Sequence, residues 1–144
     1  MASIEQFEYF QLNPNEFNKT EIPVSIMPYV ISEVFINEVI PGDLIWLNAV
    51  IGGVDNDNET KVASLNINLY KGNVFIPGKE IYSSYIEADK DGDGDIINVP
   101  LSYVDAINKA ATNVRYVLTV QLTSNINNVF IRGPLTFTAL RIRP

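Results

Sequence analysis

The sequence predicts an all-β protein, a single-domain antiparallel β-sandwich of the jelly-roll type with an extended N-terminal arm. Three observations predict it. Apolar and polar residues alternate with the period of a strand. Gly- and Pro-rich turn signals separate these stretches at strand spacing. The length of 144 residues is that of one domain, with 47% hydrophobic and 19% charged residues, which is typical of a globular chain with one core.

Two stretches carry the clearest strand pattern. In residues 62–70, alternate positions are apolar and the positions between them are polar. Residues 114–123 behave in the same way, with Val117 as the exception. Both are expected to be strands with one face in the core and one face toward water. Further strands are expected at residues 29–39, 128–131 and 135–142, which are rich in β-branched and aromatic residues.

Residues 43–51 are apolar on both faces, with Asn48 as the main exception, which indicates a central strand covered on both sides. A neighbouring subunit is one candidate for the second cover, with Leu44, Trp46 and Leu47 as contact residues. Residues 101–111 show a short helical spacing of apolar residues, and a helical turn is expected there as readily as a strand.

The first 28 residues differ from the rest, and we expect a boundary between an arm (1–28) and the sandwich (29–144). The opening segment places aromatic and large apolar groups among acids, namely Phe7, Tyr9, Phe10 and Leu12. Leaving such groups in water is costly, at ~25 cal/mol per Å². One interpretation is a first strand of the sandwich followed by a loop. The other, which we take forward, is an arm that adds a strand to another subunit.

Charge is distributed unevenly along the chain, whose net charge is −7. Residues 1–60 carry most of the acids and one base, whereas every charged residue after Asp105 is basic. One interpretation is that both regions are solvated surface. The other is a head-to-tail contact between subunits, which would bring the two regions together. The candidate basic contact surface consists of Arg115, Arg132, Arg141 and Arg143. So few basic residues in an acidic chain could contact only a few phosphate groups, and no nucleic-acid partner is expected.

The acidic stretch 89–96 has the composition of a calcium loop. Its carboxylates at alternate positions are Asp89, Asp91, Asp93 and Asp95, with Gly94 allowing the sharp turn. The residue that would supply the bidentate carboxylate is Pro100. Calcium binding and a solvated acidic hairpin tip both stay open. No other cofactor is expected.

The chain contains no Cys and no His, so thiolate and imidazole chemistry, and every Ser-His-Asp arrangement, is excluded. The remaining carboxylates cluster at expected loop tips, and an enzyme is not expected. No apolar run is long enough to insert into a membrane. The first residues lack the pattern of a signal peptide, which favours synthesis in the cytosol.

Residues 100–142 resemble a known family. They contain Ser102-Tyr103-Val104-Asp105, the strand beginning Val114-Arg115-Tyr116, and the closing segment from Phe130 to Leu140. This pattern is similar to the jelly-roll proteins of bacterial spore surfaces, the exosporium proteins and endospore appendage subunits, and broadly to the tumour necrosis factor/C1q fold. The resemblance implies a spore or cell surface location, with assembly by an N-terminal connector that donates a strand. The absence of Cys excludes disulfide crosslinking of such a fibre.

The function expected from these features is that of a non-enzymatic structural subunit that self-assembles into a fibre or ring. Its partners would be copies of itself and other spore- or cell-surface proteins. The alternative is a carbohydrate- or partner-binding module stabilised by calcium. A viral or phage jelly-roll subunit shares the physics of the first interpretation.

Overall fold

The computed structural model describes residues 1–12, 21–92 and 96–144. They form two packed antiparallel sheets and no helix, which confirms the predicted β-sandwich. No helix long and apolar enough to cross a membrane occurs in this part of the chain.

The strands run in chain order as β1 (Ser3–Leu12), β2 (Ile22–Pro23), β3 (Tyr29–Val39), β4 (Leu44–Asn56), β5 (Ala63–Lys71), β6 (Tyr82–Ala88), β7 (Ile96–Ala106), β8 (Ala111–Leu122), β9 (Val129–Ile131) and β10 (Leu135–Arg143). In sheet A the order is β1-β10-β4, with β7 on the other side of β4, and the short strands β9 and β2 extend it. Sheet B has the order β3-β8-β5-β6. The first strand, β1, thus pairs with the last strand, β10, at one edge of sheet A, and the two strand orders are those of a jelly roll.

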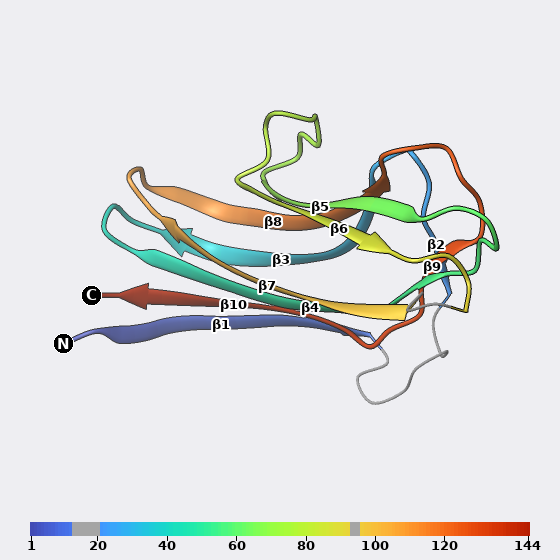
Figure 1. Ribbon diagram of the computed structural model, residues 1–144. Helices are drawn as coiled ribbons and strands as arrows, with labels where there is room; N and C mark the ends of the chain where they lie inside the picture. The colour runs from blue at the N-terminus through green and yellow to red at the C-terminus, as the bar shows by residue number, and fades with distance from the viewer. Residues whose placement is uncertain (13–20, 93–95) are drawn as a thin grey trace.

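The core lies between the two sheets (Figure 1) and follows the predicted alternation. From β5 and β8 it receives the expected residues, among them Leu65, Ile67, Tyr116 and Leu118, all fully buried. Tyr116 also donates a hydrogen bond of 2.7 Å from its hydroxyl to Asp105 of β7, which joins sheet B to sheet A. Burial, together with that carboxylate, raises the pKa of Tyr116.

The N-terminal segment is part of the sandwich, which corrects the expected boundary between an arm (1–28) and a domain (29–144). β1 pairs antiparallel with β10, from Ser3 opposite Arg143 to Leu12 opposite Leu135. Phe10 packs against the core, and the side chain of Gln6 accepts a 3.0 Å hydrogen bond from the backbone N–H of Asn37 in β3. The physical reason is that β10 has an open edge, and the chain's own first strand fills it.

Of the two conformations expected for residues 101–111, the structure shows the strand and no helical turn. Residues 101–106 belong to β7, where Leu101 faces the core and Val104 faces outward, and β8 begins at Ala111. Leu101 pairs with Ala49 of β4, so cross-strand pairing decides the conformation of a segment whose local spacing suits either structure.

Candidate functional site

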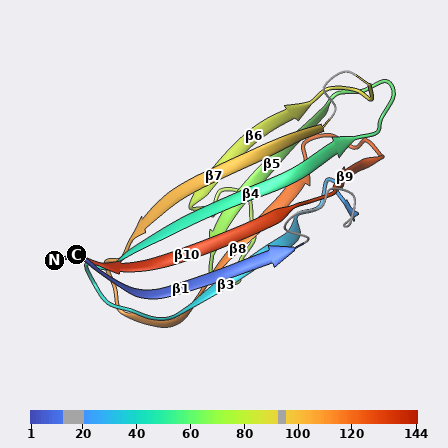
Figure 2. The same ribbon diagram turned by 90° about the horizontal axis from the view of Figure 1, so that it is seen from below.

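The outer surface of sheet A is the most unusual feature of the molecule. Figure 2 shows β1, β10, β4 and β7 side by side. The register gives four cross-strand rows of outward-facing residues on these strands. The rows are Ile4, Ile142, Leu44 and Ala106; Phe7, Leu140, Trp46 and Val104; Tyr9, Thr138, Asn48 and Ser102; and Gln11, Thr136, Val50 and Pro100. We call this set the outer A face.

None of these described positions carries a charged side chain. The charged residues within the same paired segments lie elsewhere. Glu8, Asp105 and Arg141 are in register with inward-facing rows, and Glu5 sits at a bulge between Ile4 and Gln6. Arg143, opposite Ser3, and Asp55, opposite Ile96, lie beyond the two end rows. A sheet face turned toward water ordinarily carries polar and charged residues, which alternate along each strand with the apolar residues of the buried face. The outer A face departs from this pattern, because its polar positions are all neutral.

Large apolar side chains are exposed on the outer A face. The exposed fractions are 55% for Phe7, 64% for Tyr9 and 42% for Trp46. The rings of Phe7 and Tyr9 stack with centroids 5.9 Å apart. Trp46 donates its indole N–H to the hydroxyl of Ser102 over 3.1 Å, which holds the ring against the neighbouring strand.

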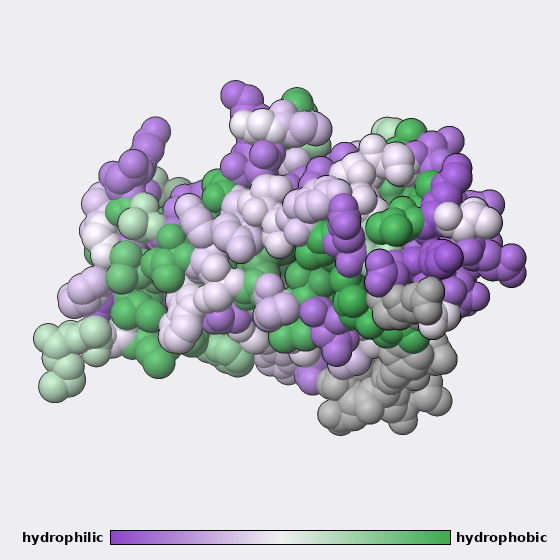
Figure 3. Space-filling view, in the orientation of Figure 1, coloured by the Kyte–Doolittle hydropathy of each residue, from purple (hydrophilic) through white to green (hydrophobic). Residues whose placement is uncertain are grey.

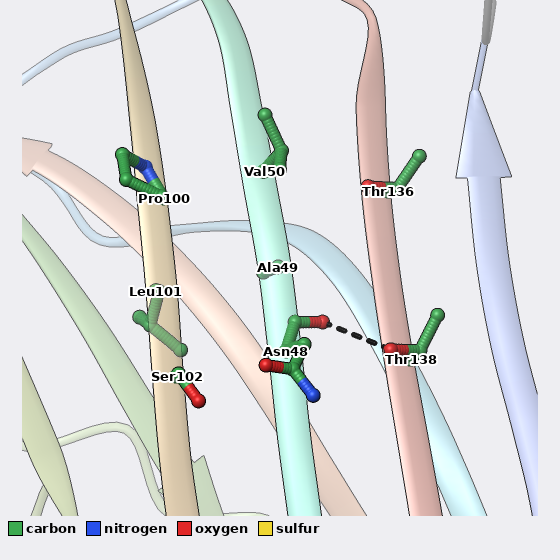
Figure 4. Close-up of a pocket in the computed structure, with 8 residues that line it drawn as sticks. All are labelled: Asn48, Ala49, Val50, Pro100, Leu101, Ser102, Thr136 and Thr138. Carbon is green, nitrogen blue, oxygen red and sulfur yellow. Dashed lines mark hydrogen bonds between the residues drawn. The ribbon is translucent and has the colours of Figure 1, made fainter.

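A groove of about 450 Å³ crosses this face over β7, β4 and β10. Figure 4 shows its lining: Pro100 and Ser102 on one side, Asn48 and Val50 in the middle, and Thr136 and Thr138 on the other side. A second hollow of about 200 Å³ lies beside Phe7 and Tyr9. Both hollows are lined by apolar and neutral polar groups only.

The residues predicted for subunit contact do not all lie on the same side of sheet A: some face outward and others face the core. Phe7 and Tyr9 of the segment predicted to be an arm point outward, whereas Phe10 packs against the core. Leu12 pairs with Leu135, and its side chain lies outside the described part. Of the predicted contact strand, Leu44 and Trp46 are on the outer A face.

The prediction that Leu47 contacts another subunit is wrong, because Leu47 is fully buried between the sheets. It was expected at a subunit contact because residues 43–51 are apolar on both faces. The period of a strand separates the two groups: Ile45, Leu47 and Ala49 face inward, and the residues between them face outward.

The four arginines of the predicted basic contact surface all pair with carboxylates of their own chain, and their role in a subunit contact stays a prediction. Arg115 pairs with Glu33, and Arg132 pairs with Glu21, Asp55 and Asp57. Arg141 and Arg143 both pair with Asp43. The acidic front and the basic tail of the sequence thus meet within one molecule, since the jelly roll brings the last strands beside the first ones.

The pair of arginines around Asp43 forms the most buried of these clusters. The carboxylate has no exposed surface, and it accepts hydrogen bonds from Arg141 Nε at 2.8 Å and Arg143 Nε at 3.1 Å. The backbone N–H of Ile40 donates a third at 3.0 Å. Burial by itself raises the pKa of Asp43, but the bonds from Arg143, Ile40 and Arg141 outweigh it, so the pKa lies below its usual value.

The calcium hypothesis falls partly outside the described residues. Asp89 and Asp91 are exposed beside the turn that precedes β7, and Asp93 and Asp95 lie outside the described part. No group of three potential metal ligands occurs in residues 1–12, 21–92 and 96–144. Calcium binding stays a prediction: calcium at 100 times its dissociation constant adds about 2.7 kcal/mol of stability, which a thermal melt with and without chelator measures.

The outer side of sheet B is different, because a loop of the same chain covers part of it. Residues 72–81 join β5 to β6 and stand above the sheet (Figure 1). Phe75 packs edge-on against Tyr70, with centroids 5.6 Å apart. Tyr70 and its strand neighbour Val117 are fully buried although both face away from the core, which explains the exception in the alternation of β8.

Several outward residues on sheet A have no counterpart in the prediction, notably Val50, Pro100 and Val104. The signal that finds them is their place in the pairing register, which brings together strands distant in sequence.

No protein-family model and no curated protein sequence matches the chain.

Among solved structures, the chain is similar to "Structure of infectious bursal disease virus Gx strain", with 11% sequence identity and a TM-score of 0.43. The match covers 97% of this chain and 41% of that chain. The chain thus spans less than half the length of that structure.

Proposed function

We propose that this protein is a structural subunit that self-assembles through the outer A face. The observation that carries the proposal is the row of Phe7, Leu140, Trp46 and Val104 within a four-stranded surface that has no charged residue. Exposed apolar patches of this kind mark protein–protein contacts. The contact proposed here is a sheet face, and β1 serves its own sheet rather than that of another subunit.

A second copy of the chain is the partner that suits this face. Each chain carries a net charge of −7, so copies repel one another wherever their charged surfaces meet. The outer A face avoids this cost because it brings no like charges together. A strongly charged partner would gain nothing from it.

The area of the face supports the same conclusion. Neighbouring strands lie about 4.8 Å apart and residues advance about 3.3 Å, so four strands over seven residues present roughly 450 Å² in projection. Covering the face with a second copy buries twice that flat area, and more when side-chain relief is counted. The total is close to the ~1,000 Å² that a specific interface needs.

The setting of the proposed assembly follows from the resemblance of residues 100–142. We propose a spore or cell surface, where subunits of a fibre or ring would contact one another and other surface proteins. The chemistry of the face does not depend on that setting, and the experiment below tests the face directly.

Trp46 is the only tryptophan of the chain and is 42% exposed on the face, so its fluorescence reports contact. We expect its emission to shift to shorter wavelength as protein concentration rises, in parallel with an increase in mass by light scattering. Val104→Lys should prevent both changes, because it places a charge in the contact. Val62→Lys is the matched control: Val62 is exposed to a similar degree (45% against 48%) but lies off the face. A wild-type protein that stays monomeric at high concentration would refute the proposal.

A further inference from the structure

The loop that projects from sheet B offers a partner for the groove on sheet A. Residues 72–78 have the sequence GNVFIPG and carry no charge. Val74 is 55% exposed and Ile76 is 56% exposed, whereas Phe75 between them packs on Tyr70. The loop therefore presents two aliphatic side chains away from the sandwich, and Figure 3 shows a small apolar area beside polar surface at the tip of this projection.

The loop is held in place by contacts with sheet B. Arg115 stacks over the Phe75 ring, 5.3 Å from its centroid, and donates a 3.0 Å hydrogen bond to the Asn73 side chain. At the base of the loop, the backbone N–H of Gly72 donates to the carbonyl of Arg115 over 2.8 Å. Because the loop is ordered before it meets a partner, docking loses little conformational entropy.

The groove on the opposite side of the sandwich has matching chemistry. Its lining residues, such as Val50, Pro100 and Thr136, are uncharged. A cavity of about 150 Å³ accommodates a benzene-sized group, so a groove of about 450 Å³ has room for the valine and isoleucine side chains of the loop.

From this match we infer that loop 72–78 of one copy docks in the groove of the next, so that the subunits stack head to tail. The inference rests on the proposed function, since it names what occupies the groove within the outer A face when two copies meet there. The loop stands above sheet B (Figure 1), whereas the groove is lined by residues on the outer side of sheet A, so the two lie on opposite sides of the sandwich. Such a contact is heterologous, and it generates an open fibre or a closed ring. An open fibre keeps one free loop at one end and one free groove at the other, whereas a ring keeps neither.

A pair of complementary variants tests the inference. Val74→Lys combined with Ile76→Lys removes the docking loop and leaves the groove intact. Val50→Lys removes the groove and leaves the loop intact, and Thr136→Lys repeats the groove test on another strand. Val62→Lys is again the control for the added charge. Circular dichroism and thermal melts report folding, and light scattering reports size.

We expect the loop variant and the groove variants each to remain monomeric at concentrations ~10-fold above those at which the wild type assembles. Mixing a loop variant with a groove variant should then give a complex of two subunits and nothing larger, because only one intact loop and one intact groove meet. If this mixture stays monomeric, the inference is wrong.

The two proposals fail in distinguishable ways. If the loop variant assembles like the wild type while the groove variants do not, head-to-tail docking is overturned, but the outer A face still self-associates, with one such face against another. If the wild type itself never assembles, both proposals are overturned.

Discussion

The buried carboxylate of Asp43 gives the sharpest test of how the structure is held together. Asp43→Asn removes the negative charge but keeps the size of the side chain. Arg141, whose side chain is 10% exposed, then loses its partner at 2.8 Å. Removing one member of a buried ion pair leaves the other charge uncompensated, and we expect a loss of about 3 kcal/mol in the free energy of unfolding at pH 7.

The effect should depend on pH with a defined sign. The pKa of Asp43 is lowered in the folded state, whereas in the unfolded chain it is about 3.9. The carboxylate therefore stabilises the fold fully above the unfolded pKa, and this contribution is lost as the pH falls through the folded pKa. Asn does not titrate, so the stability gap between wild type and variant should narrow as the pH falls below ~4.

Urea denaturation of both proteins at a series of pH values between 7 and 2.5 measures the gap. Glu59→Gln is the control, because it removes the same charge from an exposed side chain, and surface changes of this kind stay within about 0.5 kcal/mol. A gap for Asp43→Asn that is below about 1 kcal/mol at neutral pH, or one that does not change with pH, would contradict the role assigned to this carboxylate.

Three further substitutions test other parts of the fold. Arg132→Met should cost about 3 kcal/mol in urea denaturation, because it strands the nearly buried carboxylate of Asp55; an unchanged midpoint would show that the pair is dispensable. Gly52→Ala should lower the free energy of unfolding by about 2 kcal/mol, because a Cβ there would overlap the backbone carbonyl of Pro134. A variant as stable as the wild type would show that residues 52 and 134 can move apart without cost. Phe75→Ala should leave the sandwich folded by circular dichroism but speed proteolytic cleavage within residues 72–81; equal cleavage rates would argue against the aromatic anchor of the loop.

The sequence predicts most of the strands because their alternation is local. Residues 62–70 and 114–123 reveal their inner faces directly, and both faces of the central strand at 43–51 are visible as apolar. The period of two, applied strictly to that strand, assigns Leu47 to the core and Trp46 to the surface.

Features that depend on pairing between distant segments were harder to predict. The place of β1 beside β10 follows from which edge is open, and the ion pairs of Arg132 and Arg141 follow from strand order. The uneven charge was visible in the sequence, but it gave no indication of whether its two halves meet in one chain or across two. The outer A face is likewise assembled from four separate strands and appears only with their register.

The pairing of Ser3 with Arg143 brings the two ends of the polypeptide together at one tip of the molecule (Figure 2). A short linker between the ends, combined with a cut in an exposed turn elsewhere, would give a circular permutant with every sheet intact. Fluorescent or enzymatic cargo fused to either terminus would emerge from that same tip. In a stack of subunits, such cargo would be displayed in a regular row along the polymer.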